Sequence, residues 1–202
     1  MSATTALVKD VLVEALGSSA TPFVPVPFVD DWLFARLLRR IAKKVLTRRM
    51  KPVEAPWIKA LVAAYAEAGD PSLGKKVAVS AARFVVRKLA IVLDVKKSHD
   101  VFGEAIAFAV ALDLAIAGGW TDALDPRTLG IAIHHATSSV GTGLVETITR
   151  AGRAAWNRPA GDAGETRTAR IAEEIAKEVE VSRDALNAIL HRELHAAAKP
   201  HY

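Results

Sequence analysis

AIAFAVALDLAIAGGW, residues 105–120, carries one charged side chain, Asp113, in sixteen residues. An apolar stretch of this kind forms either a buried core helix or a membrane span, and a span needs about 20 predominantly apolar residues. The next apolar run, residues 128–145, is broken by histidine, serine, threonine and glycine. Because both runs fall short in length or in hydrophobicity, the sequence favours two closely packed core helices, and a membrane hairpin stays the open alternative.

The rest of the chain also predicts helices. Apolar residues recur at helical spacing, and the one alternating stretch, VPVPF at 24–28, is broken by prolines, which remove backbone donors. The fold class is therefore all-α, with about six helices in a bundle-like domain. The expected helices cover about 7–16, 30–50, 56–67, 72–95, from Ser98 or Asp100 to Gly118-Gly119, and onward from Asp125-Pro126.

The composition changes at WNRPAGDAGETR, residues 156–167, which is rich in glycine and proline and is typical of a linker. We therefore predict a helical domain over 1–156, a linker or loop over 157–167, and a C-terminal helical hairpin over 168–198. The hairpin would consist of helices at about 168–180 and 182–198. Its apolar residues are too many to stay exposed, so we expect them to pack on the main domain or on a partner chain.

Several functional classes are disfavoured by composition. The chain has no cysteine, which excludes disulfides and thiolate metal sites and suits a reducing cytoplasm. Lys9, Asp10 and Glu14 interrupt the apolar positions of the N-terminal segment, unlike the core of a secretory signal. We therefore expect a cytoplasmic protein.

The charge of the chain is concentrated in one predicted amphipathic helix, at about 30–50. Residues 28–51 contain eight bases and two acids, a net charge of +6, whereas the whole chain has +5. A local basic face suits an acidic membrane surface or another polyanion. An ordinary solvated helix face is the competing interpretation, since acids first and bases last also match the helix dipole. The residues expected to make the membrane or polyanion contact are Trp32, Arg36, Arg39, Arg40, Lys43, Lys44, Arg48 and Arg49.

The start of this helix, Pro25-Val26-Pro27-Phe28-Val29-Asp30, resembles the Pro-Ile-Pro-x-x-Asp motif of bacterial helical membrane-associated domains of the EcsC type. The resemblance covers about thirty residues. It implies a helical, membrane-associated protein and carries over no chemistry, because the function of that family is itself poorly defined.

A second resemblance lies in residues 175–190, where Ile-Ala and, further on, Val-Ser are similar to the helix-turn-helix of bacterial repressors. It implies that Arg183, Asn187 and His191 face the major groove of DNA. Glu180 stands where that family usually has glycine, and residues 165–202 sum to about −1, although a DNA-binding module should be basic.

Catalytic and metal-binding candidates are few. Asp113 on one apolar helix and His134 and His135 on the next form a predicted buried polar cluster, in which Asp113 hydrogen-bonds to a histidine or a hydroxyl. The same cluster is the best candidate for an enzyme site. His191 and His195, one helical turn apart, have a spacing that can hold zinc but lack a third ligand. We therefore expect no catalytic residue, cofactor or metal.

The leading prediction is a non-enzymatic helical protein that contacts an acidic membrane surface or acts as a scaffold, with a protein partner or a second copy of the chain as a possible further contact. The alternatives are a DNA-binding or regulatory protein that uses the C-terminal hairpin, and an enzyme built around Asp113, His134 and His135.

Overall fold

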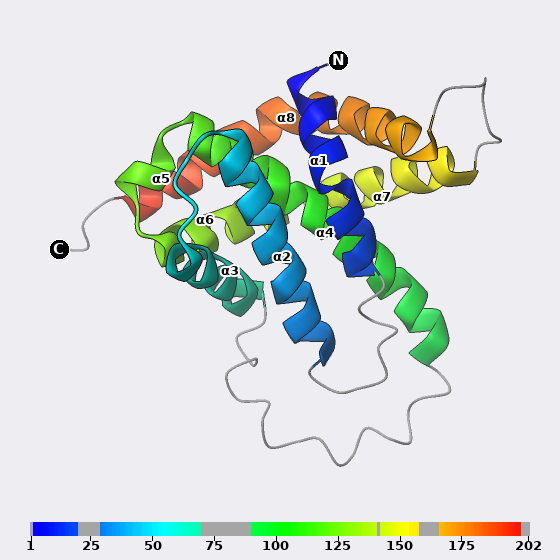
Figure 1. Ribbon diagram of the computed structural model, residues 1–202, viewed down its shortest axis with the longest axis horizontal. Coiled ribbons are helices and arrows are strands. Elements are labelled where there is room, and N and C mark those ends of the chain that lie inside the picture. Colours follow the sequence, from blue (N-terminus) through cyan, green and yellow to red (C-terminus); the bar gives the residue numbers. More distant parts are fainter. Residues whose placement is uncertain (1, 20–28, 70–89, 141, 158–165, 199–202) are drawn as a thin grey trace, which may run out of the picture.

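The computed structural model describes residues 2–19, 29–69, 90–140, 142–157 and 166–198. All regular structure in these ranges is helical, which confirms the all-α prediction (Figure 1). Outside the described residues lie the proline segment at 22–27, residues 72–89 of the helix predicted over 72–95, and most of the predicted linker. The helices are α1 (Ala3–Ser19), α2 (Val29–Arg48), α3 (Ala55–Gly69), α4 (Ala90–Ala117), α5 (Trp120–Ala123), α6 (Pro126–Ser139), α7 (Thr142–Asn157) and α8 (Arg167–Ala197).

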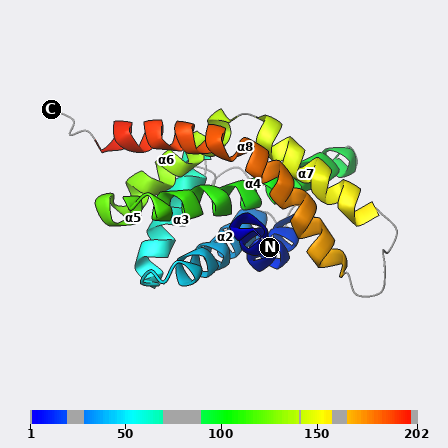
Figure 2. The same ribbon diagram turned by 90° about the horizontal axis from the view of Figure 1, so that it is seen from above.

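Helix α4 forms the centre of the fold, with α2, α6, α7 and α8 arranged around it (Figure 2). Every residue from 105 to 116 exposes 9% or less of its surface, and α1 packs along the same helix. The prediction that this stretch is a core helix is therefore confirmed. None of the helices in the described ranges is long and apolar enough to cross a membrane.

The C-terminal end of α4 and the start of α6 follow local sequence signals. Helix α4 stops at Gly118-Gly119, and Gly119 has φ 76°, a left-handed conformation that glycine adopts without strain. Helix α6 begins at Pro126, and Asp125 caps it by accepting hydrogen bonds from two backbone N–H groups. The hydroxyl of Thr128 also donates to Asp125, and this bond is the main reason that the pKa of Asp125 lies below its usual value.

Two predicted boundaries are wrong. The break expected between 95 and 98 is absent, and α4 continues from Ala90 to Ala117, because the segment Lys96-Lys97-Ser98 contains no glycine or proline to stop it. Conversely, the apolar run at 128–145 belongs to two helices, α6 and α7.

The predicted C-terminal hairpin is also wrong, since α8 is one helix of 31 residues. No helix breaker lies at Glu180-Val181-Ser182, and a serine within a helix is tolerated when packing favours the helix. The expected docking of its apolar residues on the rest of the protein is confirmed, because α8 packs on α1, α6 and α7 and joins the same core. Its larger buried apolar residues are Ile171, Ile175, Val179, Leu186, Leu190 and Leu194.

The turn after α2 is strained. Lys51 N–H donates to Leu46 O at 3.0 Å and Met50 N–H to Thr47 O at 3.1 Å, the bonds of a Schellman helix end. Met50 therefore takes φ 53°, in the left-handed region, where a side chain costs about 1 to 2 kcal/mol and glycine is usual.

Two helix crossings depend on glycine. A Cβ at Gly130 would collide with the carbonyl oxygen of Leu61 on α3, and one at Gly103 would meet the carbonyl oxygen of Val145 on α7 at 2.5 Å. By contrast, a Cβ at Gly143, in the run at 128–145 for which the sequence predicts close packing, would touch nothing within 4 Å among the described residues. The glycine composition of a helix therefore did not reveal which glycines lie at crossings.

Gly130→Ala should destabilise the protein by about 1 to 3 kcal/mol, because the added methyl group forces α3 and α6 apart. Gly143→Ala is the matched control, and it should leave stability unchanged or raise it by up to about 1 kcal/mol. Urea unfolding measures both. Equal midpoints for the two variants would contradict the close approach of α3 and α6.

Candidate functional site

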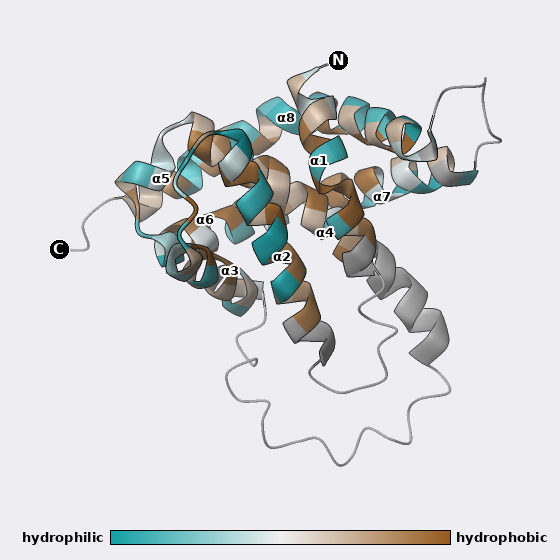
Figure 3. Cartoon of the chain, viewed as in Figure 1, coloured by the Kyte–Doolittle hydropathy of each residue, from teal (hydrophilic) through white to brown (hydrophobic). Residues whose placement is uncertain are grey.

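Helix α2 is amphipathic, and its apolar side packs against α1, α3 and α4. Figure 3 shows hydrophilic and hydrophobic residues alternating along it. Its buried residues are Leu37, Leu38, Ile41, Ala42, Val45 and Leu46. The eight bases predicted to form a single cationic face lie on the remaining sides of this helix and in the turn that follows, and the structure divides them into groups with different surroundings.

Two of the bases face α1. Lys44 Nζ lies 2.7 Å from a carboxylate oxygen of Glu14 and also donates to the carbonyl oxygen of Asp10. Arg48 donates to the carboxylate of Asp10 at 2.8 Å and to the carbonyl oxygen of Ala3. These charges are therefore matched within the chain by two acids of α1.

Two further bases bind acids at the C-terminal end of α2. Arg49 donates from Nε and Nη2 to the two oxygens of Asp113, both at 2.6 Å, and Lys51 lies 2.5 Å from Asp122. Asp113 is 8% exposed, so its predicted burial and pairing are confirmed. The hydrogen bond to Asp113 is the main reason that the pKa of Arg49 lies above its usual value.

The predicted histidine or hydroxyl partner of Asp113 is wrong. A guanidinium satisfies both oxygens of a carboxylate at once and also cancels its charge, which a neutral histidine or a hydroxyl does not. The pair joins residues that are 64 positions apart, and no pattern within α4 indicates it.

The remaining bases of α2 are exposed, except Arg39, which is partly buried. We call Arg36, Arg39, Arg40 and Lys43 the α2 stripe. Arg40 and Lys43 are exposed and have no ion pair with any residue that the structure describes. Arg39 is partly buried, and its Nε atom has no hydrogen-bond partner in the same ranges. Arg36 is exposed and has an interaction elsewhere in the chain.

The cationic face is smaller than the sequence indicates, because four of its bases pair with acids of the chain. Lys44 and Arg48 are four residues apart, as are Asp10 and Glu14, and residues at this spacing are neighbours on one helix face. This matching spacing is the feature of the sequence that could have indicated the ion pairs between the two helices. The side chain of Trp32, predicted to take part in the contact, lies outside the described residues. The role of the α2 stripe in binding stays a prediction.

The two adjacent histidines of α6 have different surroundings, and no contact in the described structure joins either one to Asp113. His134 is half-buried, packs edge-on against Tyr65 at 5.1 Å between ring centroids, and has Nε2 3.2 Å from Ser138 Oγ. Its Nδ1 is buried and has no hydrogen-bond partner among the residues that the structure describes. Burial first, and then the neighbouring His135, lower the pKa of His134 below its usual value. His135 is exposed and lies 3.8 Å from Glu193.

His191 and His195 on α8 both pack edge-on against Trp120, at 5.9 and 4.8 Å between ring centroids. They therefore form an aromatic contact between α5 and α8. Within the described ranges, no group of three or more possible ligands could hold a metal ion.

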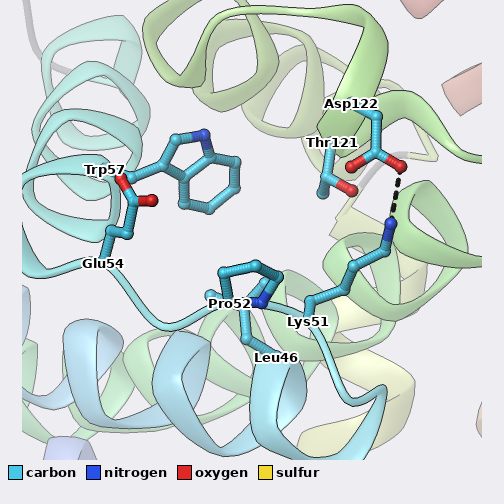
Figure 4. Close-up of a pocket in the computed structure, with 7 residues that line it drawn as sticks. All are labelled: Leu46, Lys51, Pro52, Glu54, Trp57, Thr121 and Asp122. Carbon is cyan, nitrogen blue, oxygen red and sulfur yellow. Dashed lines mark hydrogen bonds and ion pairs between the residues drawn. The ribbon is translucent and has the colours of Figure 1, made fainter.

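A pocket of about 160 Å3 lies between the turn after α2, the start of α3 and α5 (Figure 4). The ion pair between Lys51 and Asp122 closes one side of it. Ligand pockets usually measure about 300 to 1,000 Å3, so this one is small for a substrate. Its lining residues are Leu46, Lys51, Pro52, Glu54, Trp57, Thr121 and Asp122.

Comparison with known proteins found no matching family model, no similar curated protein and no similar solved structure. The resemblance of residues 25–30 to the EcsC type is therefore neither supported nor refuted, and most of that motif lies outside the described residues.

Arg49→Met should destabilise the protein by about 1 to 3 kcal/mol at pH 7, because it leaves the buried carboxylate of Asp113 without its partner. Arg40→Met, the same change in the α2 stripe, should alter stability by less than about 0.5 kcal/mol. Combining Arg49→Met with Asp113→Leu should recover most of the loss, since no buried charge then remains. Urea unfolding of the three variants tests this, and equal midpoints for the two single variants would contradict it.

The stability of the protein should fall as the pH drops below about 6.5, in part through His134. Its pKa is lower in the folded than in the unfolded chain, so protonation favours unfolding. The stabilisation is complete above the unfolded-state pKa and is lost as the pH falls through the folded-state pKa. His134→Gln should therefore lessen the dependence of the melting temperature on pH between 7 and 5. A variant whose melting temperature falls as steeply as that of the wild type would refute this assignment.

Proposed function

We propose that this protein is a non-enzymatic helical protein that binds an anionic lipid surface reversibly through the α2 stripe. The observation that carries the proposal is the separation of the bases of α2 into two groups. Lys44, Arg48, Arg49 and Lys51 pair with acids of the chain, whereas Arg40 and Lys43 have no such partner among the described residues. An exposed cation without an acid beside it is available to an external anion.

The magnitude of the effect suits reversible contact. A base near an anionic bilayer contributes about 1 kcal/mol, so a few exposed bases give weak binding that salt suppresses as the Debye length falls to about 8 Å at 0.15 M. Positions 36, 40 and 43 follow one face of a straight helix over about 10 Å, at a rise of about 1.5 Å per residue. A row of this kind fits a plane of headgroups.

The alternatives have less support. The DNA-binding prediction rested on a hairpin, and residues 175–190 lie within the continuous helix α8, where Arg183 is 3.4 Å from Glu180. The enzyme prediction needed Asp113 beside His134 and His135, but the described contacts of Asp113 lead to Arg49.

The wild-type protein should sediment with vesicles that contain phosphatidylserine and should not sediment with vesicles of phosphatidylcholine alone. It should be released from the acidic vesicles as the salt concentration rises. The double variant Arg40→Gln with Lys43→Gln should bind roughly 30-fold more weakly, which corresponds to about 1 kcal/mol for each base. Circular dichroism should show unchanged helicity, because both side chains are exposed.

The matched control is Arg150→Gln with Arg192→Gln, which removes the same charge from α7 and α8, across α4 from α2 (Figure 2). It should bind nearly as well as the wild type. Equal weakening of the two double variants would mean that net charge, and not the α2 stripe, drives binding. Binding to duplex DNA in place of vesicles, lost in the same stripe variant, would assign the stripe to a nucleic acid and overturn the lipid proposal.

A further inference from the structure

Met50 projects from the protein at the end of α2. It is 95% exposed, more than any other large hydrophobic residue among those described. Its backbone is in the left-handed conformation, where glycine is usual. The side chain therefore gains nothing from burial in this chain, and it makes its own backbone less favourable.

The turn holds Met50 in this position from both sides. Arg49, before it, binds Asp113 of α4 through two hydrogen bonds, and Lys51, after it, binds Asp122 of α5. The bond from Lys51 N–H to Leu46 O closes the turn. The exposed methionine is thus fixed on a constrained turn and does not belong to a loose loop.

Met50 lies in the turn that directly follows the exposed row of α2. Positions 36, 40, 43 and 47 are separated by four, three and four residues and are all exposed, and Met50 follows three residues later. Val53, in the same turn region, is 40% exposed. An apolar residue at the end of a cationic row is the arrangement of an interfacial element, whose bases contact headgroups while its apolar side chain enters the acyl boundary.

We infer that Met50 is an apolar anchor that enters an anionic bilayer when the α2 stripe docks on it. The inference rests on the proposed function and adds the orientation of the docked protein, with the C-terminal end of α2 toward the membrane. The occupant of this surface is a lipid bilayer, because the exposed charges of the α2 stripe are cationic and the protruding side chain of Met50 is flexible and apolar.

The deciding variant is Met50→Gly, which should shift two measurements in opposite directions. Its urea midpoint should rise, because glycine relieves the left-handed strain. Its affinity for phosphatidylserine vesicles should fall roughly tenfold, because the buried apolar area is lost. Met50→Leu keeps the apolar side chain and should bind like the wild type.

Insertion of position 50 into the bilayer is measured independently with a fluorescent label. Because the chain has no cysteine, Met50→Cys takes one environment-sensitive fluorophore, and Val181→Cys, at an 82% exposed apolar position on α8, is the matched control. The emission of the label at 50 should shift to the blue with acidic vesicles, and that of the label at 181 should stay unchanged.

The outcomes separate the inference from the proposed function. Wild-type binding that Met50→Gly leaves unchanged, with no shift at position 50, overturns the anchor and leaves the stripe proposal intact. Equal shifts at 50 and 181 overturn the orientation. Failure of the wild type to bind acidic vesicles overturns both.

Discussion

The burial of residues 105–116 of α4 on every side is the constraint on which the rest of the structure depends. Twelve consecutive residues, 105–116, have almost no contact with solvent, and one of them is an aspartate. A buried carboxylate without a partner is strongly unfavourable, so a cation has to reach it. Arg49 does so from the turn at the end of α2, and its two hydrogen bonds attach this turn to the buried part of α4. A buried charge in the core is thereby neutralised by a residue of a surface turn.

Pairing with acids of other helices also divides the bases of α2 and its following turn into two groups. The sequence shows eight equivalent bases, but folding places acids of α1, α4 and α5 beside four of them. Those bases stabilise helix contacts, and their field outside the protein is largely cancelled by the acids. The charge available to a partner comes from the residues that the fold leaves beside solvent. Arginine and lysine have the same charge in both groups, so only their neighbours distinguish a structural from a binding role.

The accuracy of prediction from sequence followed the range of the interactions involved. The C-terminal end of α4 at Gly118-Gly119 and the start of α6 at Asp125-Pro126 depend on adjacent residues, and the sequence predicted both. The break at Glu180-Val181-Ser182 was wrong because a serine that can cap a helix can also lie inside one, and the packing of α8 on α1, α6 and α7 decides between the two. Burial of Asp113 was predictable from its apolar neighbours, but its partner was not, since 64 residues separate it from Arg49.

The turn at Met50 combines interactions between adjacent residues with interactions between residues far apart in the sequence. Its left-handed backbone belongs to the Schellman end of α2, and on either side of it Arg49 and Lys51 are held by carboxylates of other helices. The ion pair that neutralises Asp113 in the core therefore also fixes the direction in which an exposed methionine projects. The exposed side of α2 therefore depends on how the charge of Asp113 in α4 is neutralised. A substitution of Asp113 is expected to affect the turn at Met50, although Asp113 itself lies in the core.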